Sequence, residues 1–360
     1  MANYAKKQDN TLMKVVKYII PWKGDKPVEI IRKVIFLISA LVLIISLTSL
    51  IVYEGRRAAG NNADSDIAAE YDSALQQEQE QQLSGGTGSM TLQGGENAKP
   101  EDVKPVIMER FKTLIEKNDD IVGWITMGEA DAPFVHYPVV QGEDNDFYLD
   151  HNFEKEKNLG GSIFTDYREP ITADSEPANI ILYGHNMASG EYFGKVTKYF
   201  NYKPGRDPSD ISFYQTYPTF TFSTLYEEHT YKIFGGMLVN TKKSEGDVFY
   251  YLRGRNFETK ADFDEYIAKI LDRSTFYTDV DLKYGDRLIT LSTCILDYGD
   301  WDLRWVLFAR RVREGEDPTV DVSKAYYNPD PLYFDAYYKY FGGSWGGRKW
   351  PAEMIFGYEG

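Results

Sequence analysis

The sequence predicts a mainly β domain of eight short strands, a barrel or a sandwich with peripheral helices, preceded by one transmembrane helix. Two features support this fold class. Between residues 105 and 313, short runs rich in Val, Ile, Tyr, Phe and Thr are separated by turn residues. Near the N-terminus, an apolar run without charge covers Val34–Tyr53. The predicted strands are Ile121–Met127, Phe134–Gln141, Gly161–Thr165, Asn179–Tyr183, Thr219–Leu225, Thr230–Val239, Arg287–Thr293 and Arg304–Arg311.

Two amphipathic helices are predicted around these strands. Val106–Glu116 has apolar side chains at helical spacing and opens the domain. Ala261–Asp272, between the sixth and seventh strands, has an apolar face of its own. We interpret that face as core packing, with substrate contact as the alternative.

The run Val34–Tyr53 is long enough to cross a bilayer. Its 20 residues, at about 1.5 Å of rise per residue, span roughly 30 Å of hydrocarbon. The preceding segment 1–33 contains 8 Lys and Arg residues against 3 Asp and Glu residues. The positive-inside rule therefore places this basic segment in the cytoplasm and the rest of the chain outside a cell membrane that it crosses once. The alternative is a cleaved signal peptide, but the run exceeds a usual signal core and no small-x-small cleavage site follows it directly.

Residues 54–104 differ in composition from both of their neighbours. They are rich in Gly, Gln, Glu, Ser and Ala, and they contain few aromatic or branched apolar side chains. Such a segment buries too little apolar surface to offset its conformational entropy, so we expect a flexible extracytoplasmic stalk with transient helix over Asp66–Gln82. The formal charge of -15 argues against a nucleic-acid partner.

Residues 314–360 form an extension that begins with the acidic segment Glu314–Pro318 and is rich in aromatic residues and glycine. So many rings in a short segment seldom remain solvated, so we expect the extension to pack on the outer face of the domain. A lid or a docking surface for a partner is the alternative.

Cys294 is the only cysteine of the chain, and it ends the strand-like run Asp286–Cys294. A single thiol cannot form an internal disulfide or a cysteine zinc site, so nucleophilic attack is the chemistry that suits it best. A lone cysteine is often a small buried apolar residue, but its place at a strand end before a polar loop favours catalysis. An exported chain without disulfides suits a Gram-positive cell surface.

Two further side chains have the properties that acyl transfer requires. His185 follows the apolar run Asn179–Tyr183, and we interpret it as a general acid and base rather than a capping or surface histidine. Arg304 lies ten positions after Cys294 and carries fixed donors for a developing oxyanion. Its alternative is an ion pair with an acidic residue of the preceding loop, namely Asp297, Asp300 or Asp302.

The other three histidines, His136, His151 and His229, are expected to be structural or solvated, because none ends a comparable strand. Four dispersed histidines give no metal-ligand spacing, so we expect neither a metal site nor a cofactor.

An ordered series of segments resembles the class B sortases over about residues 105–313. The segments are Gly123–Ile125, Tyr137–Gly142, Asp144–Leu149, Gly161–Asp166, Tyr183–Met187 and Thr290–Cys294, followed by Arg304. The resemblance implies a closed eight-stranded sortase-type β-barrel and a membrane-anchored transpeptidase whose catalytic group is His185, Cys294 and Arg304. It also implies that Asn145, Ser292 and Tyr251 lie at the substrate groove. Turn formation and a strand hydroxyl are the alternatives for Asn145 and Ser292.

The leading hypothesis for function is a cysteine transpeptidase. It would cleave a C-terminal sorting motif of secreted proteins through a thioacyl-enzyme and transfer the acyl group to a cell-wall amine or a pilin lysine. The resemblance suggests a motif of the Asn-Pro-x-Thr-Asn or Ser/Asn-Pro-x-Thr-Gly type. One alternative is a cell-surface cysteine peptidase that hydrolyses peptidoglycan peptides, although papain-like hydrolases usually place the cysteine before the histidine. A tethered binding domain without activity is the third hypothesis, which the presence of all three reactive residues disfavours.

Overall fold

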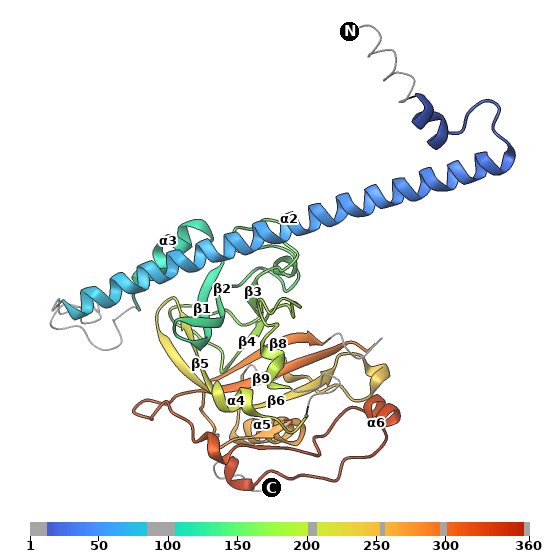
Figure 1. Ribbon diagram of the computed structural model, residues 1–360. Coiled ribbons are helices and arrows are strands. Elements are labelled where there is room, and N and C mark those ends of the chain that lie inside the picture. The colour runs from blue at the N-terminus through green and yellow to red at the C-terminus, as the bar shows by residue number, and fades with distance from the viewer. Residues whose placement is uncertain (1–12, 85–104, 201–206, 253–255, 296–300, 356–360) are drawn as a thin grey trace. The chain divides into compact units, whose positions relative to one another are not determined.

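The computed structural model describes residues 13–84, 105–200, 207–252, 256–295 and 301–355 (Figure 1). The chain divides into two compact units, residues 1–59 and 60–360. Helix α2, Pro27–Leu83, contributes residues to both units. Its portion in the first unit contains the apolar run of the sequence, and this helix is long and apolar enough to cross a membrane by length and composition.

The second unit is built around a closed barrel of eight strands, as predicted. The order around the barrel is β1-β2-β3-β4-β8-β9-β6-β5. The pairs β2–β3 and β4–β8 are parallel, and the other neighbours are antiparallel. The strands are β1 Ile121–Glu129, β2 Ala132–Val140, β3 Ile163–Thr165, β4 Asn179–Tyr183, β5 Thr219–Thr224, β6 Glu228–Asn240, β8 Leu288–Ile295 and β9 Leu303–Arg311.

Successive side chains of each strand point alternately into the barrel and away from it. On β8, Ile289 and Leu291 belong to the cluster that fills the barrel, whereas Leu288 belongs to a second cluster on the outside. Helix α5, Lys260–Arg273, covers this outer face beside β6 (Figure 1). Its apolar face is buried there, which confirms core packing as the role of that face.

Helix α3, Glu109–Lys117, and the end of α2 pack over β1 (Figure 1). Tyr71 of α2 stacks on Trp124 of β1 with ring centroids 3.9 Å apart, and Ile67 joins the same buried cluster. Residues 60–83 of the expected stalk are thus helical and attached to the barrel, while residues 85–104 lie outside the described residues. The segment was expected to be flexible because its average composition is polar. Ile67 and Tyr71, one helical turn apart, nevertheless give the helix an apolar face that packs on the barrel.

The C-terminal extension packs on the barrel as expected. Its strand β10, Tyr326–Tyr327, pairs with β7, Phe276–Tyr277. Phe334 joins the barrel cluster, and Trp350 packs with the α5 cluster while its indole nitrogen donates to Asp272 at 2.8 Å. Other short helices among the described residues of the second unit are Phe147–Leu149, Val196–Tyr199, α4 Ser212–Thr216, Lys243–Glu245, Val322–Lys324, α6 Asp335–Phe341 and Ala352–Met354.

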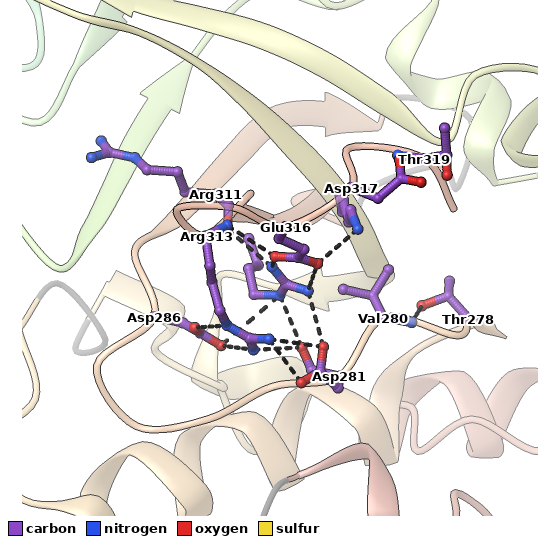
Figure 2. A network of polar contacts seen from close by, with 11 residues as sticks. Thr278, Val280, Asp281, Asp286, Arg311, Arg313, Glu316, Asp317 and Thr319 are labelled. Carbon is purple, nitrogen blue, oxygen red and sulfur yellow. Dashed lines mark hydrogen bonds and ion pairs between the residues drawn. The ribbon is translucent and has the colours of Figure 1, made fainter. Parts of the chain in front are cut away.

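An ionic network attaches the beginning of the extension to the barrel (Figure 2). The guanidinium of Arg310 on β9 is 1% exposed and contacts Glu316 at 2.6 Å and Asp281 at 3.0 Å. Arg313 contacts Asp281 at 2.8 Å and Asp286 at 2.7 Å. The hydrogen bonds from Arg310 hold the pKa of the Glu316 carboxyl well below its usual range. The positive charges of two arginines and the negative charges of three carboxylates therefore neutralise one another where the extension follows β9.

Candidate active site

Cys294 and Arg304 lie opposite each other on neighbouring antiparallel strands. Cys294 is the next-to-last residue of β8, and its partner in the register is Arg304, the second residue of β9. Directly opposed residues of an antiparallel pair have Cβ atoms about 4.5–5.5 Å apart on the same face of the sheet. The next pair along, Ile295 and Leu303, packs inside the barrel. Cys294 and Arg304 therefore lie on the outer face, and both side chains are half-buried.

His185 lies beside the same strand end. It comes two residues after β4, which runs parallel to β8. Two hydrogen bonds continue the contact beyond β4: the Thr293 hydroxyl donates to the Gly184 carbonyl at 2.7 Å, and the Asn186 amide donates to the Cys294 carbonyl at 2.9 Å. The residues on either side of His185 are thus tied to β8 at Cys294 and its neighbour.

The imidazole of His185 has a defined partner. Its Nε2 lies 2.7 Å from the carbonyl oxygen of Leu149, which can only accept a hydrogen bond, so Nε2 carries the hydrogen. Within the described part of the chain, Nδ1 has no hydrogen-bond partner. The contact fixes the ring and leaves Nδ1 as the nitrogen that can exchange a proton, which is the arrangement of an oriented base.

Arg304 forms the ion pair that the sequence raised as an alternative. Its Nη1 donates to Asp302 at 2.9 Å, and the two side chains are 31% and 40% exposed. Asp302 is itself held, since its backbone nitrogen donates to Glu245 at 3.2 Å. Asp297 and Asp300 lie outside the described residues. The ion pair orients the guanidinium and leaves its Nε and Nη2 donors without a hydrogen bond inside the described ranges.

Similar proteins place this arrangement in a family, although no protein-family profile matches the chain. The chain is 33% identical to Sortase B of Listeria monocytogenes over 198 residues, which are 55% of this chain and 72% of that protein. The chain belongs to the class B sortases. It is also 30% identical to Sortase B of Staphylococcus aureus over 213 residues, 59% of this chain and 77% of that protein.

The fold of this sortase agrees with the family. It matches the solved Staphylococcus aureus sortase B-substrate complex with a TM-score of 0.54 and 25% identity, over 70% of this chain and 96% of that one. The closed eight-stranded barrel is the sortase barrel, and the protein is a sortase-type cysteine transpeptidase.

Two of the predicted substrate contacts, Ser292 and Tyr251, bond to each other. Their hydroxyl oxygens are 2.8 Å apart, and the residues are 2% and 9% exposed. The hydroxyl of Tyr266 on α5 donates to the Tyr251 carbonyl at 2.9 Å, so α5 holds Tyr251 against β8. Burial raises the pKa of Tyr251, and the negative charges of ionised Cys294 and of Asp166 raise it further, whereas the Ser292 hydrogen bond and the charge of Arg304 oppose the shift. Tyr251 is therefore within electrostatic range of two reactive residues.

The third predicted contact, Asn145, lies in a neighbouring polar network centred on Asp166, whose charge also acts on Tyr251. Its amide donates to Asp166 at 3.3 Å, and the hydroxyl of Tyr183 donates to the same carboxylate oxygen at 2.9 Å. Arg168 adds three hydrogen bonds to that carboxylate, two from its guanidinium and one from its backbone nitrogen. Burial alone would raise the pKa of Asp166, but the hydrogen bonds from Arg168 and Tyr183 lower it to about 2. The substrate role of Asn145 stays a prediction.

Three residues that shape the site were not predicted from the sequence: Asp166, Leu149 and Tyr266. Asp166 follows the apolar strand β3, which is the same strand-end signal that identified His185. Leu149 acts through its backbone carbonyl, so its side chain gave no signal. Tyr266 lies on an apolar helix face, where the pattern predicts a buried ring but gives no indication of a hydrogen bond from its hydroxyl.

The other histidines make local contacts. His136 pairs with Asp72 at 3.0 Å, His151 stacks on Phe147, and His229 pairs with Glu227 at 2.9 Å. These contacts agree with structural roles. In the described part of the chain, no group of three or more His, Cys, Asp or Glu side chains is placed to hold a metal ion.

Proposed function

We propose that this sortase cleaves a C-terminal sorting motif of secreted proteins and joins the acyl fragment to a cell-wall amine or a pilin lysine. Cys294 is the nucleophile, His185 the general acid and base, and Arg304 the group that binds the oxyanion. The main support is the register that sets Cys294 opposite Arg304, with His185 bonded through its neighbours to the same strand end.

In the first half-reaction, the Cys294 thiolate attacks the carbonyl carbon of the threonine in the motif. A C–S bond forms and the carbonyl oxygen gains the negative charge, which the free donors of Arg304 stabilise. One hydrogen-bond donor to an oxyanion typically raises kcat about 10²–10³-fold. The C–N bond then breaks while Nδ1 of the His185 imidazolium gives its proton to the departing amine, and a thioester remains on Cys294. A positioned general acid typically raises the reaction rate about 10²–10⁴-fold.

In the second half-reaction, the acceptor amine attacks the thioester carbonyl. Nδ1 of His185 takes the proton from the attacking amine, the C–S bond breaks, and the thiolate of Cys294 is restored as the new amide forms. Throughout, Nε2 keeps its hydrogen bond to the Leu149 carbonyl, so the ring transfers protons from one nitrogen without turning.

Tyr251, Ser292 and Asn145 contribute to substrate binding in this proposal. The Tyr251–Ser292 pair lies on the outer face next to Cys294 and presents a rigid, largely buried wall to the acyl part of the motif. The expected motif is of the Asn-Pro-x-Thr-Asn or Ser/Asn-Pro-x-Thr-Gly type.

The proposal also includes a membrane anchor. The apolar part of α2 crosses the membrane once, with the basic segment 1–33 in the cytoplasm and the catalytic unit outside. Residues 1–12 of that segment lie outside the described residues. Because Cys294 is the only cysteine, a membrane-impermeant maleimide tests the orientation. Intact cells should be labelled at Cys294, and labelling that occurs only after lysis contradicts this orientation.

The activity is tested with the full chain in detergent. Sorting peptides of both motif types and a panel of amines are added, and the products are identified by mass. We expect cleavage after threonine and amine-ligated product, with neither formed by Cys294→Ala at unchanged folding. Cleavage without ligation at saturating amine would instead favour a cysteine hydrolase.

A further inference from the structure

Helix α2 contacts the segment that follows His185. Two residues of one helical turn make these contacts: the amide of Asn61 donates to the Glu191 carboxylate at 2.5 Å, and Asp64 accepts from the Tyr192 hydroxyl at 2.7 Å. Asn61 and Asp64 both belong to the second unit, together with the barrel.

Tyr192 is held in one conformation. Its ring is buried and stacks on Tyr137 with centroids 4.9 Å apart. Its backbone has a φ of 49°, in the left-handed region that a tyrosine rarely adopts. A Cβ at Gly160 would overlap the Tyr192 ring, so glycine at that position gives the ring its space. Such a constrained residue persists only where its surroundings determine it, and Asp64 is one of the groups that do so.

Tyr192 is connected to His185 through the backbone. It forms a β-bridge with Asn186, and the amide of Phe193 donates to the His185 carbonyl at 3.0 Å. Asn186 is the residue whose side chain bonds to the Cys294 carbonyl. The segment 185–193 is therefore a loop whose two ends are hydrogen-bonded to each other. Near its start Asn186 bonds to β8, and near its end Glu191 and Tyr192 bond to α2.

The same turn of α2 also reaches the segment that holds the imidazole. Gly60 packs so closely against Asn158 that a side chain at position 60 would overlap it. The Asn158 backbone amide donates to the Asp150 carbonyl at 2.9 Å, next to Leu149, whose carbonyl accepts from His185 Nε2. One helical turn thus contacts both the segment that carries His185 and the segment that orients its ring.

We propose that residues 60–64 of α2 position His185 for proton transfer, and that Asn61 and Asp64 are positioning residues for the sortase reaction. The inference rests on the proposed role of His185. In this proposal, the end of helix α2 contributes to catalysis because it holds the acid–base residue His185 in place relative to Cys294.

The test compares two double variants of the full chain in detergent. Asn61→Ala with Asp64→Ala removes both hydrogen bonds to the His185 segment. Asn62→Ala with Asp66→Ala is the matched control, because it removes the same residue types from exposed positions of the same helix. We expect the first variant to lose about tenfold in kcat, with KM for the sorting peptide within twofold, because small displacements of a catalytic group reduce chemistry more than binding. The control should match the wild type.

Two further measurements separate positioning from general stability. Asp64→Asn keeps an oxygen that accepts from Tyr192, so it should retain the wild-type kcat. Asp64→Ala and Tyr192→Phe remove the same hydrogen bond, so their effects on kcat should not add. The kcat of the double variant should therefore be no lower than that of the less active single variant. Wild-type kcat in Asn61→Ala with Asp64→Ala, or single losses that multiply in the double variant, would overturn the inference. Failure of the proposed function is distinct from this, since it would show as no cleavage by the wild type.

Discussion

Glu316→Gln is expected to weaken the attachment of the C-terminal extension to the barrel. Glu316 lies 2.6 Å from Arg310 and 2.7 Å from Lys232, and both cations are buried. Breaking a buried ion pair costs about 3–5 kcal/mol. The cost is lower here because Asp281 remains 3.0 Å from Arg310 and because Glu316 is 22% exposed. We therefore expect a loss of about 2 kcal/mol, or roughly 4–6 °C in Tm.

The pH dependence gives a second measure of the same network. The Arg310 hydrogen bonds lower the pKa of Glu316 in the folded state, so the carboxylate contributes its stability above the usual glutamate pKa. That contribution is lost as the pH falls through the lowered value. The difference between Glu316→Gln and the wild type should therefore be largest near neutral pH and shrink in strong acid.

Urea unfolding of the full chain in detergent, followed by tryptophan fluorescence, measures both effects. Glu314→Gln is the control, because Glu314 is an exposed carboxylate two residues away. It should change the free energy of unfolding by less than about 0.5 kcal/mol. The reasoning is refuted if Glu316→Gln is as stable as this control at neutral pH.

Three further predictions concern the site and its supports. Tyr266→Phe leaves the side-chain NH2 of Asn179 and the Tyr251 carbonyl without the Tyr266 hydroxyl and should lower the free energy of unfolding by about 2 kcal/mol. Tyr284→Phe removes a hydrogen bond made by an exposed ring and should lower it little in the same urea titration. Asp166→Asn should cost about 2 kcal/mol at pH 7, because the pKa of Asp166 is lowered to about 2, and the loss should narrow as the pH falls from 4 toward that value; an equal loss at pH 3 would contradict this. Asp64 is the opposite case, since burial raises its pKa to about 6 and the folded state favours the protonated form. The Tm of the wild type minus that of Asp64→Asn should therefore rise as the pH falls from 7.5 to 5, and a difference that stays constant would contradict this. The ionisable groups that act on Asp64 are Tyr192, Tyr137, Glu191 and Glu154.

Most of the barrel could be predicted because its strands carry period-2 apolar patterns between clear turn signals. The ends of two of those strands, each followed by a polar loop, identified Cys294 and His185 as candidate reactive groups. The pairing of Cys294 with Arg304 needed the register of β8 and β9, which ten residues of spacing do not determine. The resemblance to class B sortases implied that Arg304 acts with Cys294, but not that the two residues lie opposite each other on neighbouring strands.

The contacts around His185 had no comparable signal. The orienting group is the backbone carbonyl of Leu149, which every residue type provides. The contribution of α2 was hidden because Asn61 and Asp64 lie in a polar segment whose average composition predicts a flexible stalk. Local composition reports how much apolar surface a segment holds, and it does not report that two large side chains, Ile67 and Tyr71, share one face.

The most direct test of the catalytic proposal is the intact mass of the full chain after brief incubation with a sorting peptide in the absence of amine. The wild type should gain the mass of the acyl fragment as a thioester, which hydroxylamine removes, and peptide mapping should place the adduct on Cys294. Cys294→Ala should gain nothing. Peptide cleavage without any adduct on Cys294, or an adduct that persists in Cys294→Ala, would contradict the proposal that this thiol carries the acyl group.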